Sequence, residues 1–512
     1  MEPSKKVAMA LTHAKQVTDR HHAHILKSTE ISRSDRELLI RTKWLQEIIK
    51  GWYLLTRPDL ASGDSAAWYA NFWDFLRVYL KSRFKENYCL SAETSLELQI
   101  GSSLTPLQVI AITKQGGTIQ SLPFKTSLLI YSDSKNFPNN KIELNGLQMM
   151  PLALALCKLA PTYYKKYREN VEIALRSIRA TSDITRIIID NQFKAAAERI
   201  IGAYEFLNLK KEALEIKSDL ERAGMIIHAA NPFSSDLNHF TLRSFRSPYA
   251  ARIELMWHKL RETVIDNFPK EPGLPKNKKQ YLAEVSELYE YDAYNSLSIE
   301  GYQVSPDLIQ KVQKNSWNPS LHSEDQQERN ALAARGYFEA FQSVKKTLVK
   351  ILKGQLPGDC IAHDLSAWYQ NLFSPCVRAG IISHSALIGY RNDRVFIRNS
   401  RHSPPPREAV LDAMESFFKC LKEEKSPAVR AILGHYIFVF IHPYMDGNGR
   451  IARFILNTML ASGGYPWSIV QVQRRKEYIN ALETAHTTSN IAPFVRFIAD
   501  EMKVSKKLLK SL

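Results

Sequence analysis

The spacing of apolar residues predicts helices towards both ends of the chain and short strands between them. The stretch SDRELLIRTKWLQEIIKG (34–51) starts with a capping serine, has apolar residues at helical spacing and ends at a glycine, so we expect a helix there. Residues 96–100, 107–113 and 127–132 are β-like runs separated by Gly, Ser, Asn and Pro. Amphipathic helix is expected over 160–227, and most of the chain beyond residue 280 has a helical pattern.

Two polar segments that contain proline interrupt this pattern. Residues 231–248 look like a connector, and residues 267–279 form a loop rich in Pro and Lys. We therefore predict a mainly α protein in three parts. These are a helical domain over 1–85, a mixed α/β to helical domain over 86–228, and a helical domain over 240–505.

The composition is that of a globular protein, with 45% hydrophobic and 24% charged residues among 512. Lys and Arg outnumber Asp and Glu by 69 to 52, which suits nucleic acid or nucleotide phosphates but also suits plain solubility. Five cysteines without a CxxC pair argue against a disulfide framework or a zinc site. No apolar run reaches the length of a membrane span, so we expect a soluble cytoplasmic protein.

The strongest chemical signal is FIHPYMDGNGRIAR, residues 440–453. An apolar helix leads to His442, and a glycine-containing turn leads into a second helix, whose free backbone N–H groups attract anions. Arg450 and Arg453 share one face of that helix and can bind phosphate oxygens. Asp446 offers a hard oxygen ligand for Mg²⁺, and His442 can accept a proton from a hydroxyl. Each residue alone is equally explained by a helix cap or a tight turn, but the set indicates nucleotidyl or phosphoryl transfer.

The stretch HPYMDGNGRIAR (442–453) resembles the signature of the Fic family, His-Pro-Phe-x-Asp/Glu-Gly-Asn-Gly-Arg-x-x-Arg. Most members of that family transfer AMP from ATP to a hydroxyl side chain of a target protein. The resemblance implies an all-helical Fic fold over 240–505, with His442 as general base and Asp446 as Mg²⁺ ligand. It implies nucleotide-binding roles for Gly447, Asn448, Gly449, Arg450 and Arg453. Tyr444 departs from the usual phenylalanine.

The implied activity is that of a protein adenylyltransferase that uses ATP and Mg²⁺ and modifies a Ser, Thr or Tyr hydroxyl. UMP transfer, removal of AMP and phosphorylation are alternatives at the same site. Gly449 favours adenylyl transfer, because family members that act as kinases tend to have lysine at this position.

A lone β-like island occurs at GYRNDRVFIRNSRHSPPP, residues 389–406. Alternating Val395 and Ile397, with a turn before them, predict a small hairpin. An ordinary surface hairpin would have the same pattern. The stretch is also similar to the family's flap, in which Tyr390, Val395 and Ile397 would border the edge that pairs with an extended segment of the target.

The stretch SLSIEG (296–301) ends a predicted helix near 281–301, with Ser296 and Glu300 on one face. A glutamate at a helix end is often only a solvated charge. The stretch is similar, however, to the family's inhibitory motif, in which Glu300 would pair with Arg453 and obstruct the γ-phosphate. This resemblance implies inhibition in cis by a helix that precedes the catalytic motif.

Tyr478 and Leu482 lie four residues apart in RRKEYINALETAH (474–486), where family members complete the adenine pocket. Packing in the core is the alternative role for both.

The N-terminal half has no defensible catalytic motif. WLQEIIKGWYLLTRPD (44–59) and the stretch after it distantly resemble winged-helix antitoxins of abortive-infection systems, which implies that this region could bind DNA. A helical protein-interaction domain that presents the target is the alternative. The resemblance to Fic proteins also raises the expectation of a homodimer, and a nucleotide-sensing regulator that binds DNA is a further functional hypothesis.

Overall fold

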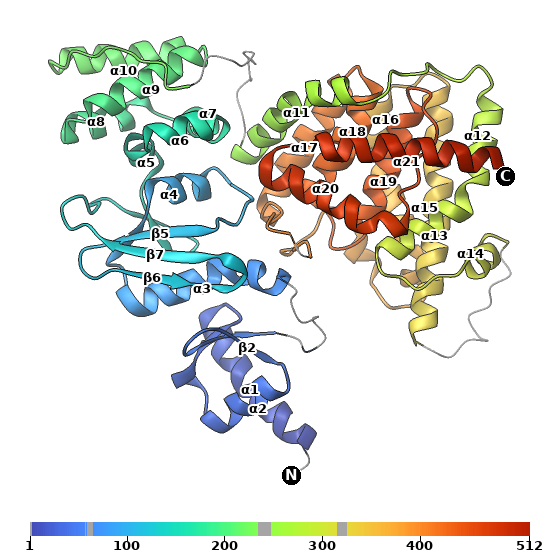
Figure 1. Ribbon diagram of the computed structural model, residues 1–512, viewed down its shortest axis with the longest axis horizontal. Helices are drawn as coiled ribbons and strands as arrows, with labels where there is room; N and C mark the ends of the chain where they lie inside the picture. The colour runs from blue at the N-terminus through green and yellow to red at the C-terminus, as the bar shows by residue number, and fades with distance from the viewer. Residues whose placement is uncertain are drawn as a thin grey trace. The chain divides into compact units, whose positions relative to one another are not determined.

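The computed structural model describes residues 3–56, 58, 65–233, 247–314, 325–398 and 400–511. The chain forms two compact units (Figure 1), the first made of Met1–Pro248 and Phe396–Ser403, the second of Tyr249–Val395 and Pro404–Leu512. Within the described residues, no helix is both long and apolar enough to cross a membrane. Most of the connector predicted at 231–248 lies outside the described residues.

The first unit begins with a small module of helices and strands. Its elements are α1 (Pro3–His21), β1 (Ile25–Lys27), the 3-10 helix η1 (Ser28–Glu30), α2 (Arg33–Arg41), β2 (Leu45–Ile49) and β3 (Trp52–Leu55). β3 pairs antiparallel with β1 on one side and β2 on the other. Helix, strand, helix and a final β-hairpin is the order that a winged helix has. The winged-helix assignment stays a prediction.

The helix predicted over 34–51 is wrong in its second half. α2 ends at Arg41, Lys43 adopts a positive φ of 62°, and the chain continues as the hairpin of β2 and β3. Ile48 and Ile49 are β-branched and favour the extended conformation, and Gly51, at a φ of 82°, permits the tight turn. Pairing between strands therefore overrides the helical spacing of the apolar residues.

A mixed sheet follows in the same unit. Its elements are α3 (Ala66–Phe84), β4 (Tyr88–Leu90), α4 (Ala92–Gln99), β5 (Gln108–Thr113), β6 (Thr118–Ser121), η2 (Pro123–Lys125), β7 (Ser127–Ser132), β8 (Ile142–Leu144) and β9 (Leu147–Met149). The strand order is β4-β5-β7-β6, with β5 and β7 parallel. The run at 96–100, expected as a strand, lies in and just after α4, which Ser91 caps by accepting a hydrogen bond from the backbone N–H of Thr94.

Helices complete the first unit. They are α5 (Leu152–Lys158), α6 (Pro161–Lys166), α7 (Arg168–Ser177), α8 (Thr181–Asn191), α9 (Lys194–Phe206) and α10 (Lys210–Arg222). α3 packs in one hydrophobic core with residues of the N-terminal module, such as Ile25 and Trp52, and with the mixed sheet. The predicted domain boundary near residue 85 therefore falls at the end of a helix that both neighbouring parts share.

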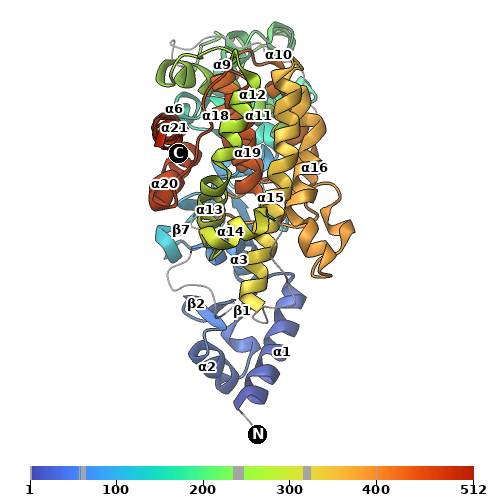
Figure 2. The ribbon, with the colours of Figure 1, turned by 90° about the vertical axis from the view of Figure 1, so that its right-hand side faces the viewer.

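Helices are the regular secondary structure of the second unit within its described residues (Figure 2). Its helices are α11 (Pro248–Asn267), α12 (Lys278–Glu287), α13 (Tyr289–Ile299), α14 (Pro306–Gln313), α15 (Asp325–Leu352), α16 (Pro357–Arg378), η4 (His384–Leu387), α17 (Arg407–Glu423), α18 (Pro427–Ile441), α19 (Asn448–Ala461), η5 (Val472–Arg474), α20 (Arg475–Thr488) and α21 (Ala492–Ser511). The prediction of a mainly α protein with a mixed α/β N-terminal region is confirmed.

The core of the second unit is built on two packed helix pairs, α15 with α16 and α18 with α19. α15 and α16 lie alongside each other in Figure 2 and approach closely at Gly336. A Cβ atom on Gly336 would lie 2.0 Å from the backbone oxygen of Leu372, so glycine is required for this approach. The pair frames α19, and Phe454 of α19 contacts the rings of Tyr337 on α15 and Trp368 on α16.

The hairpin predicted at 389–406 is wrong: none of the described residues there forms a strand, and one isolated bridge joins His402 to Leu104. Two local causes explain the irregular backbone. Pro404, Pro405 and Pro406 have no backbone N–H to donate to a ladder. The guanidinium group of Arg391 is tied to backbone carbonyl oxygens of Asp393 and Pro405, which bends the segment on itself.

Candidate active site

The catalytic-type turn begins where α18 ends. Ser426 caps the start of α18, and the helix is buried along its whole length, so its C-terminal end is held rigidly in the core. His442 follows with a positive φ of 52°, a left-handed conformation that ends the helix, and its N–H donates to the backbone oxygen of Phe438. Pro443 then prevents the helix from resuming.

Asn448 fixes the shape of the turn between α18 and α19. Its side-chain oxygen accepts a hydrogen bond from the backbone N–H of Tyr444 at 3.0 Å, and its amide group donates to the backbone oxygen of Tyr444 at 2.8 Å. Gly447 caps α19 at a φ of 81°. The ring of Tyr444 stacks on Tyr369 of α16, with 3.7 Å between ring centroids. The asparagine and the ring together hold the turn in one conformation.

His442 is arranged as a base. Its Nδ1 lies 3.2 Å from the backbone oxygen of Val439, and a carbonyl can only accept, so this nitrogen carries the proton and Nε2 is left as the basic atom. Burial lowers the pKa of His442 to about 4. The imidazole is therefore neutral at physiological pH and can accept a proton.

Arg450 is buried with unmet donors. It is 1% exposed and lies between the rings of Tyr302 and Phe373, with its guanidinium carbon 5.2 Å from each centroid. Its Nε and Nη2 find no hydrogen-bond partner in the described parts of the chain, although Nη2 lies 3.3 Å from a carboxylate oxygen of Asp446. Buried donors without acceptors are rare, so an anion from outside the chain would fit here.

Arg453, one turn further along α19, has its donors engaged. Its Nε donates to the hydroxyl of Ser296 at 2.9 Å, and its Nη2 donates to the backbone oxygen of Ser296 and, at 2.7 Å, to Glu300. Although burial opposes it, the Glu300 carboxylate raises the pKa of Arg453. The predicted pairing of Glu300 with Arg453 thus agrees with the observed contact, and the structure adds a contact of Arg453 with Ser296.

Glu300 also lies directly against the N-terminus of α19. A Cβ atom built on Gly449 would lie 2.4 Å from the Oε1 atom of Glu300, so the carboxylate touches the backbone of the first turn of α19. This is the place where a helix N-terminus attracts an anion. Glycine at position 449 is what lets a negatively charged group come so close.

Asp446 lies at the mouth of the turn, with its side chain 62% exposed. One carboxylate oxygen accepts a hydrogen bond from the backbone N–H of Gly447 at 2.6 Å. The described residues contain no group of three or more His, Cys, Asp or Glu side chains that could enclose a metal ion. A single exposed carboxylate fits Mg²⁺, which usually takes one or two protein carboxylates and completes its shell with phosphate and water.

Residues 363–460 match the family model described as the Fic/DOC family. This range contains the turn, His442 and both arginines. This segment of the chain is similar to the Fic/DOC family. Its resemblance to this family, inferred from the motif alone, is confirmed.

Over 115 residues the chain is 40% identical to the protein adenylyltransferase Fic of Drosophila mojavensis and to that of Drosophila melanogaster. The alignment covers 22% of this chain and 22% and 23% of the two relatives. Among solved structures, a fragment of Fic-1 from C. elegans is similar with a TM-score of 0.37 and 18% identity, over 67% of this chain and 87% of that chain. A Fic domain containing signaling protein from Bacteroides thetaiotaomicron has a TM-score of 0.36 and 16% identity, over 51% and 97%.

The three predicted flap residues all belong to the irregular segment 389–406. Tyr390 packs towards Tyr444, with 6.0 Å between ring centroids, and Val395 and Ile397 are half-buried in the irregular segment. The neighbouring Arg391 fixes the base of this segment to the catalytic turn, because its Nε donates to the backbone oxygen of His442 at 2.8 Å. The role of these residues in target binding stays a prediction.

Tyr478 and Leu482 are buried in the helical core, 2% and 5% exposed. The hydroxyl of Tyr478 pairs with Nε2 of His435 at 2.8 Å, and its ring packs on Phe494 and Phe497. The core-packing alternative thus describes their surroundings, and a role beside adenine stays a prediction.

Sequence reasoning missed the aromatic residues beside Arg450. Phe373 lies on α16, far from the motif in sequence, and no local pattern indicated it. Tyr302 follows the inhibitory stretch by one residue, and its aromatic ring two positions after Glu300 was a signal that could have been used.

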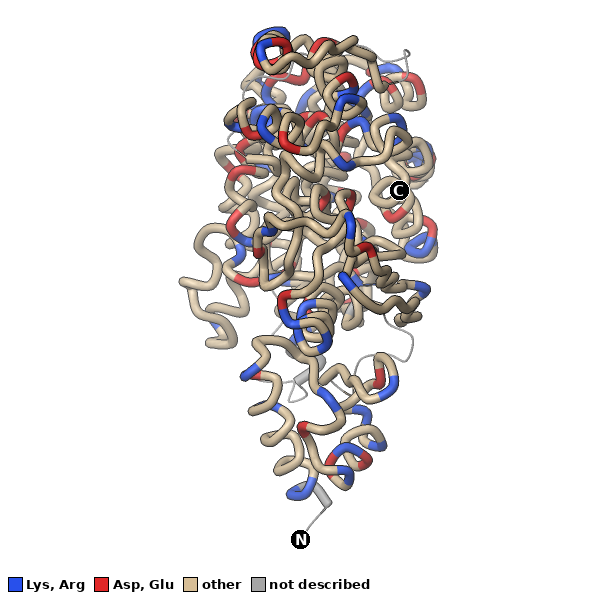
Figure 3. Tube along the Cα trace, turned by 90° about the vertical axis from the view of Figure 1, so that its left-hand side faces the viewer, with Lys and Arg blue, Asp and Glu red and all other residues tan. Residues whose placement is uncertain are grey.

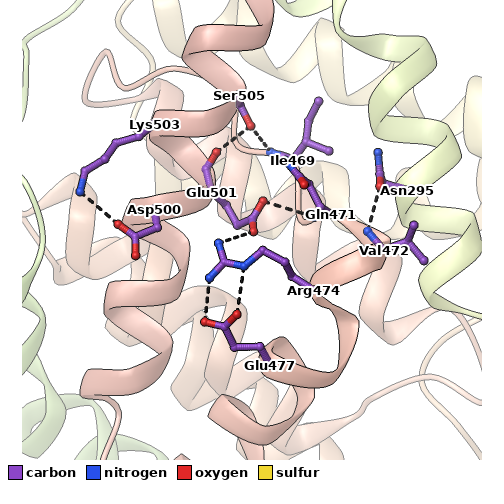
Figure 4. A network of polar contacts seen from close by, with 10 residues as sticks. All are labelled: Asn295, Ile469, Gln471, Val472, Arg474, Glu477, Asp500, Glu501, Lys503 and Ser505. Atoms are coloured by element: carbon purple, nitrogen blue, oxygen red, sulfur yellow. Dashed lines mark hydrogen bonds and ion pairs between the residues drawn. The ribbon is translucent and has the colours of Figure 1, made fainter.

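The helix that carries Glu300 is also held from its outer side, by the segment 469–475. The backbone N–H of Val472 donates to the side-chain oxygen of Asn295, and Nε of Arg475 donates to the backbone oxygen of Ile299. Figure 4 shows that this segment is held in turn by α21: the buried Glu501 accepts hydrogen bonds from the backbone of Gln471 and from Arg474. α13 is therefore fixed by groups from several helices.

Proposed function

We propose that this chain is a protein adenylyltransferase that transfers AMP from ATP to a hydroxyl side chain of a target protein. One observation carries the proposal. A neutral imidazole with a free Nε2 lies beside a helix N-terminus where the buried Arg450 has donors without acceptors. A base next to an anion site is the arrangement that phosphoryl-type transfer needs. The names of the Drosophila relatives agree with this reaction.

In the proposed reaction, Nε2 of His442 accepts the proton of the target hydroxyl, and the oxygen of that hydroxyl attacks the α-phosphorus of ATP. A bond forms between that oxygen and phosphorus, the bond to the bridging oxygen breaks, and pyrophosphate leaves. The backbone of residues 447–449 and the guanidinium group of Arg450 bind and orient the phosphates. Asp446 would hold Mg²⁺, which neutralises phosphate charge when it is bound.

We further propose that Glu300 inhibits this reaction. Its carboxylate engages Arg453 and lies against Gly449, so it takes the position where a terminal phosphate of ATP would otherwise meet the same groups. Two anions at one helix N-terminus repel each other, so nucleotide cannot bind productively until Glu300 leaves.

The test is to incubate the Glu300→Gly protein with labelled ATP and a cell lysate and to analyse modified proteins by mass spectrometry. We expect AMP adducts on Ser, Thr or Tyr, several-fold above those made by the unmodified chain, and none with the Glu300→Gly, His442→Ala double variant. A UMP or phosphate adduct would instead support the alternative donors, and loss of AMP from a modified substrate would support the reverse reaction. Adducts that persist without His442 would contradict the proposal.

DNA binding by the N-terminal module is a second candidate function, favoured by its connectivity of helix, strand, helix and hairpin. Residues 3–56 contain ten Lys and Arg against five Asp and Glu, and Arg41, Lys43 and Lys50 are exposed on α2 and the hairpin. Figure 3 shows basic and acidic residues interspersed along the chain, so charge alone is weak support.

A gel-shift assay with the full chain tests this second function. We expect a shift of double-stranded DNA that weakens steeply as salt rises. The Arg41→Glu, Lys50→Glu double variant should lose the shift. No shift at low salt, with target modification intact, would favour the alternative role of this region in protein interaction.

A further inference from the structure

The face of α13 that carries Glu300 has two further polar residues, each one turn apart. Asp292 and Ser296 precede Glu300 by eight and four residues, which places all three on the same face of the helix. Asp292 is 4% and Ser296 2% exposed, so both lie inside the domain, whereas the side chain of Glu300 is 30% exposed. The buried residues need hydrogen-bond partners from neighbouring helices.

These partners come from two neighbouring helices, α19 and α15. Nε of Arg453 donates to the hydroxyl of Ser296 at 2.9 Å, and the hydroxyl of Tyr337 donates to Oδ2 of Asp292 at 2.8 Å. Arg453 also donates to the backbone oxygen of Ser296. α13 is therefore attached inside the domain at two buried positions one turn apart, Asp292 and Ser296.

Both attachments are shielded from water. Tyr337 is fully buried, and burial raises the pKa of Asp292 to about 6, which still leaves the carboxylate ionised at neutral pH. In the interior, removal of one member of a hydrogen-bonded pair leaves the other member without that partner. By contrast, an ion pair with a partly exposed carboxylate, such as that of Glu300, contributes little by itself.

We propose that Asp292 and Tyr337 are positioning residues for the inhibition: their buried hydrogen bond, one turn before the contact of Ser296 with Arg453, holds α13 in place and so keeps Glu300 on Arg453. This inference rests on the proposed function of Glu300. It adds to Glu300, at the end of the helix, a buried hydrogen bond at Asp292, two turns earlier, as a second structural element of the inhibition. Neither Asp292 nor Tyr337 contacts the expected nucleotide site, so both act through Arg453 and Glu300.

The variant Tyr337→Phe removes the hydroxyl that donates to Asp292 and keeps the ring. We expect it to raise AMP transfer about fivefold, the factor that corresponds to one lost intramolecular hydrogen bond. The variant Asp292→Asn keeps an oxygen that can accept from Tyr337 and should have a smaller effect. Tyr289→Phe is the matched control, because Tyr289 is equally buried on α13 and its hydroxyl has no hydrogen-bond partner within the described residues.

A double-variant cycle separates positioning from a general loss of stability. In the Glu300→Gly background, Tyr337→Phe should give no further increase, since the glutamate that it positions is gone. An equal increase with and without Glu300, or the same activity for Tyr337→Phe and Tyr289→Phe, would overturn the inference.

Amide hydrogen exchange over residues 289–299 gives a second readout that does not depend on the reaction. Tyr337→Phe should speed exchange in α13 relative to Tyr289→Phe, because the helix loses a buried attachment. If Glu300→Gly shows no AMP transfer but this difference in exchange is seen, the proposed function fails while the positioning role stands. If the exchange rate of α13 is unchanged, the positioning role of Tyr337 and Asp292 is refuted.

Discussion

Two arginines one turn apart on α19, Arg450 and Arg453, differ in how many of their donors have hydrogen-bond partners. Arg453 donates to Ser296 and Glu300, whereas two nitrogens of Arg450 have no hydrogen-bond partner in the described part of the protein. Buried guanidinium nitrogens without acceptors are costly, and the rings of Tyr302 and Phe373 offset only part of that cost. Nη2 of Arg450 lies 3.3 Å from the exposed carboxylate of Asp446 and can still donate to a further anion, whereas Arg453 is bound by Glu300.

At the residue scale, the pH dependence of the reaction tests the environment of His442. Burial lowers the pKa of His442 to about 4, so the free base is present above that pH and is lost as pH falls through it. We expect kcat/KM of the Glu300→Gly protein to stay level from about pH 8 down to about pH 6 and to fall only in stronger acid, because kcat/KM follows the ionisation of the free enzyme.

Initial rates of AMP transfer measured across this range check the prediction. The control is a thermal unfolding curve at each pH, which excludes loss of folded protein. An acid limb near the ordinary histidine pKa would show that His442 is solvated rather than buried.

At the element scale, α13 is held on its inner side by α15 and α19 and on its outer side by the segment 469–475. The latter depends on α21, where Glu501 is 0% exposed and accepts from Arg474 at 2.7 Å (Figure 4). α13, which leads to Glu300, is therefore part of the packed core of the domain.

We expect Glu501→Gln to destabilise the protein by about 1–3 kcal/mol, because it weakens a charged hydrogen bond whose acceptor carboxylate is buried. The measurement is the free energy of unfolding in urea. Asp500→Asn is the matched control, since Asp500 pairs with Lys503 at the surface, and it should change the stability by less than about 1 kcal/mol. Equal effects of the two variants would contradict the assigned role of Glu501.

At the scale of the whole molecule, nucleotide binding should appear as a gain in thermal stability. A ligand that binds only the folded state stabilises it by about 2.7 kcal/mol at a concentration 100 times its Kd. We therefore expect ATP with Mg²⁺ to raise the Tm of the Glu300→Gly protein more than that of the unmodified chain. His442→Ala in the same background should keep this gain, because the imidazole is assigned to chemistry rather than to phosphate binding.

Differential scanning calorimetry with and without nucleotide measures this difference. The same Tm shift in both proteins would show that Glu300 does not compete with the nucleotide. A shift that disappears with His442→Ala would assign the histidine to binding.

Sequence patterns predicted the structure correctly where neighbouring residues determine it. The buried α18 and the glycine turn before α19 depend on neighbouring residues, and they agree with the sequence prediction. The helix expected over 34–51 and the hairpin expected at 389–406 failed because hydrogen bonds and prolines, rather than the periodicity of apolar residues, decided the backbone there. In the first, β2 pairs with β3, and in the second, Arg391 and three prolines bend the backbone.

The sequence by itself determined the mainly α class, the Fic-type motif and the identity of the residues that carry the proposed chemistry. It did so because helical periodicity and a turn of fixed spacing are properties of contiguous residues. Only the tertiary structure decided that Arg450 is enclosed by rings from two other segments, and that Tyr337 binds Asp292 on the helix that leads to Glu300. Such contacts depend on how helices pack, and packing is set by the complementary shapes of surfaces that are far apart in the chain.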